Sequence, residues 1–413
     1  MEQISPSTGA MSPSARRKGF AAAIMLMAMS AIGPGFITQT ATFTAKLGAS
    51  FAFAILASVI IDFVVQTNIW RMVTLTRMRA SDIANAAIPG SGYLLAILVI
   101  IGGLFFNIGN IAGAGLGLNA LLGIGPKLGG AIAALVAIGI FLSKRAGVAM
   151  DRVVLVAALV NLVLILYACI AAAPPVGEAI RQTFMPDKIS FATITTIVGG
   201  TVGGYITYSG AHRLLDKGTV GPEHIHEANR AALTGIIVTG VMRYVLFLAI
   251  LGVVAAGTVL DISGKTANPA GQAFLASCGD VGYRIFGAVF LAAALTSVIG
   301  AAYTSVSFLT VFKKDMTEHG RNIATIGFIA FSLLCFVLMK TTPAAMLVFV
   351  GGLNGLVLPV GLSIFLYAAY ACTRLMGGYR YPRWLLAVGV LVCLLTWYMA
   401  YKSVGPIFAF LSM

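Results

Sequence analysis

Two stretches of the 413-residue sequence place glycine and polar side chains together inside apolar runs. The first runs from Gly33 to Thr40 and contains Pro34 between two glycines, and the second runs from Gly199 to Thr207 and contains four glycines. Proline removes an amide donor and glycine costs about 1 kcal/mol relative to alanine inside a helix, so we expect a helix to open at each stretch. Unwound backbone at membrane depth is tolerated only beside protein or a water-filled cavity, which predicts a central binding site there. The predicted substrate site comprises Gly33, Gly35, Phe36, Thr38, Gln39, Thr40, Thr201, Gly203, Gly204, Tyr205 and Thr207.

The two stretches resemble copies of one another. Gly-Phe-Ile-Thr at 35–38 matches Gly-Tyr-Ile-Thr at 204–207 except for one aromatic residue. Five predicted spans separate the copies, an odd number, so the second half of the chain enters the membrane upside down relative to the first. This arrangement is an inverted repeat. Glycines that only let helices pack closely would give the same composition, and this alternative stays open.

Two ionisable groups fall well inside predicted spans, and they occupy equivalent places in the two halves. Asp62 lies in the second span and Arg243 in the seventh. Charges within a membrane are costly and usually face the protein interior and find a partner. We expect either a structural ion pair, or a role for one of the two residues in binding the substrate or a coupling ion.

The elements that must position these residues are membrane-spanning helices. The chain is 59% hydrophobic and 10% charged, with a mean hydropathy of +0.97, whereas a soluble domain carries about 25% charged residues. A helical span needs about 20 apolar residues, and such runs recur along the chain. The predicted spans cover residues 20–43, 49–70, 92–122, 129–143, 153–173, 191–210, 231–256, 282–312, 322–340, 343–370 and 384–405.

The distribution of positive charge orients these eleven spans. With the N-terminus in the cytoplasm, most of the 27 Lys and Arg residues fall in cytoplasmic segments, as the positive-inside rule requires. The sequence therefore predicts a multi-pass protein of the cell inner membrane with a cytoplasmic N-terminus and an external C-terminus. It divides into a cytoplasmic tail (1–18), a first repeat of helices one to five (19–180), a second repeat of helices six to ten (190–370) and helix eleven (384–405).

Several other functions are not supported by the residues. The net charge of +14 is scattered over short loops, so we expect lipid as the partner and no nucleic acid. The four histidines, including His212, fall in predicted cytoplasmic loops, and the five cysteines show no paired spacing. No acid pair or Ser/His constellation is predicted at membrane depth, so we expect no enzyme activity and no cofactor.

Further short motifs resemble the Nramp family of divalent-metal transporters, whose fold is the LeuT-like inverted repeat of five plus five helices. The resemblance implies an all-α membrane protein with about eleven helices, of which helices one and six are broken. It also implies secondary transport of a metal ion, by symport. Beyond the first break, the motifs that carry it are Val65-Gln66-Thr67, Arg71, Ser81 to Ala84 with Ala87, Leu118 to Ile124, Gly199 to Val202 and Leu358-Pro359.

The residues at the expected metal site differ from the family pattern. Nramp proteins bind the ion with Asp and Asn of an Asp-Pro-Gly-Asn break and with Met of a Met-Pro-His break, and here Gly33 to Phe36 and Gly203 to Tyr205 stand at these places. The acids of helix three, implicated in proton movement, fall on Asn107 and Asn110. A bare divalent cation at mid-membrane needs anionic or strongly donating oxygen ligands, so we assign no metal ligand.

Three readings of function stay open. Resemblance favours a metal ion, whereas hydroxyls, amides and open helix ends suit a small organic solute such as a carboxylate, an amino acid or 5-oxoproline. The association of this divergent branch with 5-oxoprolinase subunits is the reason for the last candidate. A membrane sensor that kept the fold and lost transport is the third reading.

Overall fold

The computed structural model describes residues 32–264, 266–313 and 316–412, and these form helices and connecting turns with no β-strand among them. The predicted residues 20–31 of the first span lie outside this part of the chain. The helices are α2 (Pro34–Leu47), α3 (Phe51–Thr76), α4 (Ala80–Ala87), α5 (Ser91–Leu122), α6 (Pro126–Leu142), α7 (Lys144–Ala171), α8 (Val176–Phe184), α9 (Phe191–Gly199), α10 (Tyr205–Asp216), α11 (Ile225–Ala255), α12 (Pro269–Ser307), α13 (Glu318–Leu338), α14 (Pro343–Ala371) and α15 (Arg383–Phe408).

Each predicted span corresponds to helical structure in the described residues. By length and hydropathy, seven helical segments are able to cross a membrane, and the first of them contains both α2 and α3. The end of α7 and the whole of α8 form a further apolar pair bent by 107°, and α6 is apolar but only 17 residues long. The sixth span is divided between α9 and α10. The chain is thus an all-α, multi-pass membrane protein with its sixth helix broken.

Local sequence explains where the long helices begin and end. Helix α12 starts at Pro269 behind Asn268, whose side chain accepts a hydrogen bond from Gly271 N at 3.0 Å. Thr342 caps α14 in the same way, with Pro343 following it. Proline is suited to the first helical turn because an amide there has no intrahelical partner. Helix α5 ends at Leu122 and is followed by Gly123, which has a φ of +74° that glycine adopts without strain.

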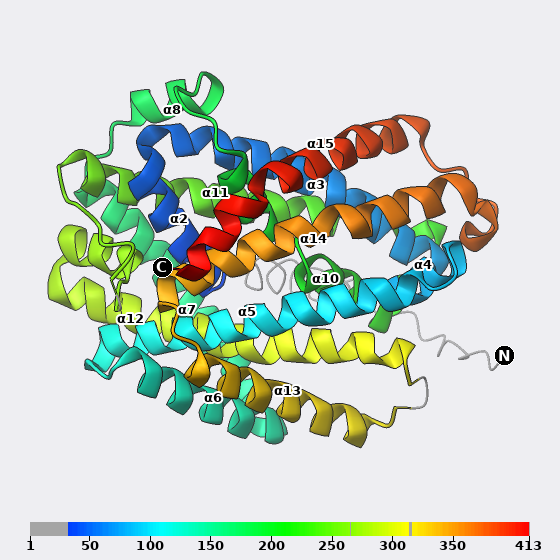
Figure 1. Cartoon of the computed structure of the whole chain (residues 1–413), viewed down its shortest axis with the longest axis horizontal. Helices are drawn as coiled ribbons and strands as arrows, with labels where there is room; N and C mark the ends of the chain where they lie inside the picture. Colours follow the sequence, from blue (N-terminus) through cyan, green and yellow to red (C-terminus); the bar gives the residue numbers. More distant parts are fainter. Residues whose placement is uncertain (1–31, 265, 314–315, 413) are drawn as a thin grey trace.

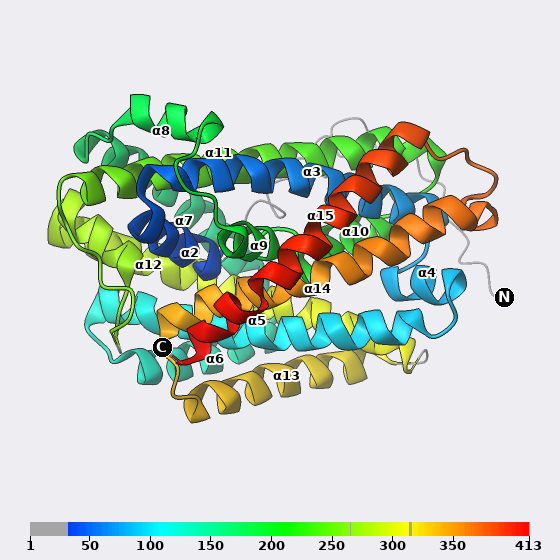
Figure 2. The same ribbon diagram turned by 45° about the horizontal axis from the view of Figure 1, so that its top comes forward.

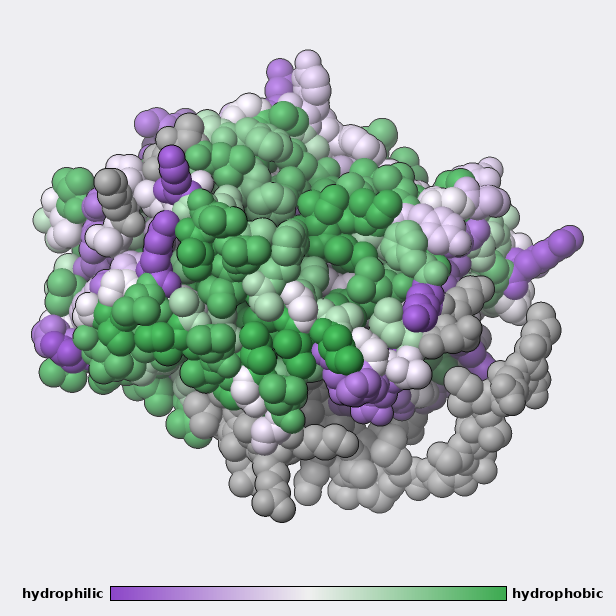
Figure 3. All heavy atoms as spheres, turned by 60° about the horizontal axis from the view of Figure 1, so that its bottom comes forward, coloured by the Kyte–Doolittle hydropathy of each residue, from purple (hydrophilic) through white to green (hydrophobic). Residues whose placement is uncertain are grey.

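The long helices run roughly along the long axis of the molecule, and α8 and α4 lie toward opposite ends of it (Figure 1). Turned by 45°, the molecule shows α9 near the centre of the bundle, beside α2 and α15 (Figure 2). A broad apolar surface covers the middle of the face shown in Figure 3, and polar residues gather toward both ends. This band is the surface expected of a protein whose middle is surrounded by lipid.

Close contacts between backbones bring the broken helix into the centre. A Cβ atom on Gly199 of α9 would lie 2.0 Å from the carbonyl oxygen of Gly351 and 2.2 Å from the amide nitrogen of Gly355, both on α14. Small residues permit such approaches between helices in membranes. Both interpretations of the glycine pattern therefore apply in this part of the chain. Some glycines let helices pack closely, and others form the break.

Candidate functional site

The break in the sixth span covers residues 200–204 between α9 and α10. Val198 O accepts hydrogen bonds from the backbone N–H groups of Thr201, Val202 and Gly203, which closes α9 in a tight turn. Gly204 then has φ +54° and ψ −130°, a conformation that residues with a Cβ atom rarely adopt. Helix α10 restarts at Tyr205, so its first amide groups have no partner within the helix.

Helix α2 begins at the position predicted for the break in the first span. Gly33 is extended, with φ −92° and ψ −176°, and Pro34 is the first helical residue. A Cβ atom on Gly113 of α5 would lie 2.3 Å from Pro34 Cβ, so α5 packs directly against the start of α2. Thr40 donates a hydrogen bond to Phe36 O at 2.7 Å, as membrane threonines commonly do.

Gln39 connects the two breaks through a side chain that is fully buried. Its Nε2 donates a hydrogen bond to Leu347 O of α14 at 3.0 Å, which fixes which end of the amide is nitrogen. Its Oε1 has no hydrogen-bonding partner. A Cβ atom on Gly200 would lie 2.5 Å from this oxygen, so Gln39 from α2 reaches the beginning of the second break.

Asn354 of α14 occupies the other end of the second break, and it was not among the predicted site residues. It is fully buried, and its Nδ2 donates to Val350 O at 2.9 Å and to Gly102 O at 3.3 Å. Its Oδ1 has no hydrogen-bonding partner and would lie 1.8 Å from a Cβ atom on Gly204. Two buried amide oxygens without partners therefore flank residues 200–204.

Hydroxyl groups without partners add to this polar region. Thr38 on α2 and Thr207 on α10 are buried, and neither Oγ1 makes a hydrogen bond. The backbone of Thr207 is held in place because its carbonyl oxygen accepts a hydrogen bond from Trp70 Nε1 at 2.8 Å. Unsatisfied buried polar atoms are costly, so the atoms of this kind beside the breaks are candidates to bind a ligand.

The two predicted intramembrane charges lie on either side of a narrow pocket between α3 and α11. Asp62 Oδ2 accepts a hydrogen bond from Thr201 Oγ1 at 2.7 Å, and Arg243 Nη1 donates to Ile197 O at 3.3 Å. The Arg243 guanidinium also stacks on the Phe36 ring, 4.2 Å from its centroid. Asp62 therefore contacts the break in the sixth span, and Arg243 contacts both α9 and α2.

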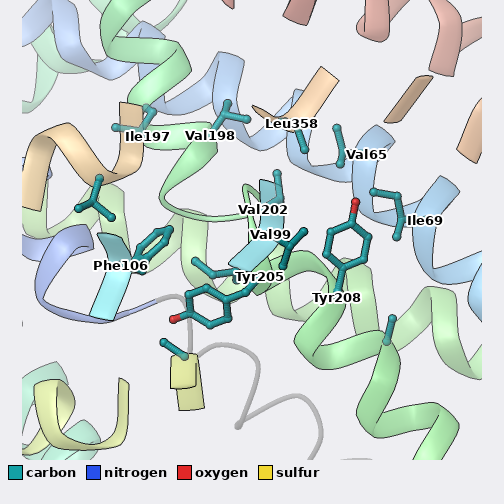
Figure 4. Packing of buried hydrophobic residues seen from close by; sticks show 14 of the residues in the cluster. Val65, Ile69, Val99, Phe106, Ile197, Val198, Val202, Tyr205, Tyr208 and Leu358 are labelled. Atoms are coloured by element: carbon teal, nitrogen blue, oxygen red, sulfur yellow. The ribbon is translucent and has the colours of Figure 1, made fainter. Parts of the chain in front are cut away.

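The predicted helix-three residues have separate surroundings. Asn107 on α5 donates to Ser332 Oγ of α13 at 3.2 Å, away from the breaks. Asn110 lies beside the Tyr205 hydroxyl at the start of α10. The Tyr205 ring packs edge-on against Phe106 with centroids 5.2 Å apart, and Figure 4 shows its hydroxyl directed away from that of Tyr208.

The prediction for His212 is wrong. The sequence predicts a loop at this residue, whereas α10 continues to Asp216 and His212 is buried on it. Its Nε2 accepts a hydrogen bond from Ala80 N at 3.1 Å, at the first residue of α4. The helix extends further than its apolar run because the bundle, rather than lipid, supplies partners for its polar residues.

Comparison with known proteins gives the family. A model of the natural resistance-associated macrophage protein-like (Nramp) family matches residues 24–405. The chain belongs to this family. Two membrane proteins are similar to the Nramp-like chain over most of its length: YcsG of Bacillus subtilis (strain 168), 52% identical over 90% of each chain, and one of Haemophilus influenzae, 48% identical over 96% of this chain and 98% of the other.

Solved structures share the fold of this Nramp-like protein at low sequence identity. A manganese transporter of Eremococcus coleocola has a TM-score of 0.74 at 14% identity, covering 98% of this chain and 91% of the other. MhsT in complex with L-phenylalanine has a TM-score of 0.58 at 17% identity, covering 94% and 98%. The predicted LeuT-like fold is confirmed, with the sixth helix broken between α9 and α10.

Proposed function

We propose that this Nramp-like chain is a secondary transporter for a small organic carboxylate that carries an N–H group, such as an amino acid or a cyclic amide acid. The substrate binds between the breaks of the first and sixth spans. Family membership supports transport as the activity. The side chains at the breaks support the class of substrate.

The observation that carries the proposal is the pair of free amide oxygens. Gln39 Oε1 and Asn354 Oδ1 cannot be exchanged for their amide nitrogens, because each nitrogen already donates to a backbone carbonyl. Both oxygens are therefore acceptors, and a buried acceptor without a donor is costly. A ligand ammonium group placed between them would donate to both, and a single amide N–H would satisfy one of them.

The opposite end of such a substrate needs donors. Helix α10 begins in the middle of the bundle at Tyr205, and its first N–H groups and its dipole favour a carboxylate. The Thr38 and Thr207 hydroxyls are further donors without present partners. Neutral donors at one end and neutral acceptors at the other match a small molecule with both kinds of group.

A bare divalent cation fits these residues less well. In the part of the chain that the structure describes, no group of three or more His, Cys, Asp or Glu side chains is arranged to hold a metal ion. Asp62 supplies a carboxylate at the sixth break, and the Arg243 guanidinium attracts it. Hard cations require several oxygen ligands that offset the loss of their hydration shell. Manganese is the alternative substrate, because the solved structural relative is described as a manganese transporter.

The direction of insertion and the domain division stay predictions. We propose that the N-terminus is cytoplasmic and the C-terminus external, as the positive-inside rule predicts for the inner membrane. We expect the two repeats, 19–180 and 190–370, to share the site and helix eleven at 384–405 to lie outside the repeat.

Thermal-shift measurements on purified protein test the substrate class, because a ligand stabilises the state that binds it. The probes are manganese chloride, acetate, 5-oxoproline and single L-amino acids. We expect an organic probe to raise the melting temperature and manganese to leave it unchanged. For each variant, the melting temperature with ligand is compared with that of the same variant without ligand. We expect Asn354→Ala to lose the shift and Ser363→Ala, on the same helix, to keep it. A shift with manganese alone overturns the proposal, and organic binding without transport in proteoliposomes favours the sensor.

A further inference from the structure

The pocket between α3 and α11 has a composition unlike the rest of the membrane interior. Its lining includes both intramembrane charges, Asp62 and Arg243, together with the hydroxyl residues Ser58, Thr201 and Thr239. The space left free is about 10 Å³, close to the least volume that holds one water molecule. All five of these side chains are buried.

The charged groups in this pocket are incompletely satisfied. Asp62 Oδ1 has no hydrogen-bonding partner, and neither do Nε and Nη2 of Arg243. The other side chains lining the pocket are uncharged, and Phe36, which α2 contributes behind the guanidinium, is uncharged as well. Arg243 is therefore the charged group that acts on Asp62. If Asp62 and Arg243 formed an ion pair only for stability, these atoms would be expected to hydrogen-bond to one another.

We propose that this pocket is a proton-coupling site in which Asp62 binds and releases one proton during each transport cycle. A proton from a hydronium ion on one side of the membrane adds to the carboxylate and leaves water behind, and it returns to water on the other side. The water-sized space beside Asp62 admits the carrier. The role in transport rests on the proposed function, whereas proton binding itself does not.

The residues in contact with Asp62 explain how protonation reaches the substrate site. Thr201 Oγ1, which donates to the carboxylate, belongs to the break between α9 and α10. Arg243 contacts Ile197 O near the end of α9 and the Phe36 ring at the start of α2. Protonation removes the negative charge that strengthens the Thr201 hydrogen bond and attracts Arg243. The contact with the sixth break therefore weakens, and Arg243 is held by Ile197 O and Phe36 alone.

Other ions suit the pocket less well. A metal cation requires a shell of oxygen ligands and would lie against the Arg243 guanidinium. An anion would lie against the Asp62 carboxylate. A proton needs neither the space nor a ligand shell, and an uncharged Asp62 beside Arg243 keeps one charge in the pocket instead of two.

Infrared difference spectroscopy between acidic and neutral pH measures the proton directly, without substrate. We expect the C=O band of a protonated carboxylic acid in wild type at acidic pH and its loss in Asp62→Asn. In Arg243→Gln the band persists to higher pH by about one to three units, because an opposite charge nearby no longer favours the carboxylate. The control is Asp280→Asn, an exposed residue paired with Arg284, which leaves the buried band in place.

Transport provides the second measurement. Asp62→Asn is expected to exchange 5-oxoproline across proteoliposome membranes but not to accumulate it when a pH gradient is imposed. Absence of the infrared band in wild type at every pH overturns the proton site, and so does a band that survives Asp62→Asn unchanged. A normal band with no movement of any organic probe leaves the proton site standing and instead refutes the proposed function.

Discussion

Substitution of Gly204 by alanine tests whether the break in the sixth span is built as described. The new methyl group would meet Asn354 Oδ1 at 1.8 Å, and φ +54° with ψ −130° strains any residue with a Cβ atom. The strain costs about 1–3 kcal/mol and the overpacking about 1–3 kcal/mol, so we expect a loss of about 2–6 kcal/mol in the free energy of unfolding.

The assay is the apparent melting temperature of the purified protein in detergent. For a chain of this size, the entropy of unfolding converts 1 kcal/mol to about 1 °C, so Gly204→Ala is expected to melt about 2–6 °C below wild type. Gly139→Ala is the matched control, because a Cβ atom on this helical glycine of α6 meets nothing within 4 Å. Alanine there should be neutral or slightly stabilising.

A double variant separates the two sources of the cost. Asn354→Ala removes the oxygen that the new methyl group would strike, so Gly204→Ala should cost at least about 1 kcal/mol less in the Asn354→Ala background. Additive effects would show that Asn354 does not lie against Gly204. Equal melting temperatures for Gly204→Ala and Gly139→Ala would refute the break itself.

Three more predictions follow from the same contacts. Gly199→Ala places a methyl group 2.0 Å from the Gly351 carbonyl oxygen, a backbone atom that cannot rotate away. Little monodisperse protein of this variant should therefore elute in size-exclusion chromatography. The control Gly327→Ala, whose Cβ meets nothing within 4 Å, should elute normally. Trp70→Phe removes the donor to Thr207 O and should lower stability by about 1–3 kcal/mol in thermal unfolding; no change would show that water replaces the bond. Gln39→Leu should weaken binding of the organic substrate by at least about tenfold in calorimetry, corresponding to 1.4 kcal/mol, and unchanged affinity would remove Gln39 from the site.

Much of the fold was predictable because its signals are local. Apolar run lengths located α5, α13, α14 and α15 to within a few residues, and the glycine pattern located the break at 200–204. Membrane helices must satisfy their backbone internally, so hydropathy carries unusually strong structural information. The extent of α10 was underestimated, because the polar residues in its last turns read as a loop.

The candidate site was harder to predict from the sequence than the fold. Gln39 stands next to a recognisable break, but Asn354 lies in the apolar helix α14 without a local motif, and only the packing of α14 against Gly204 shows where its oxygen lies. Asp62 and Arg243 were evident as intramembrane charges. Their links to Thr201 and Phe36 depend on contacts between elements far apart in sequence, which periodicity does not encode.

Counterflow in proteoliposomes tests the substrate assignment most directly. Vesicles loaded with unlabelled solute are diluted into a trace of the same labelled solute, in parallel for 5-oxoproline, a panel of L-amino acids and manganese. We predict transient accumulation of an organic solute by wild type, loss of that accumulation in Asn354→Ala, and none for manganese. Accumulation of manganese with no movement of any organic probe would contradict the account.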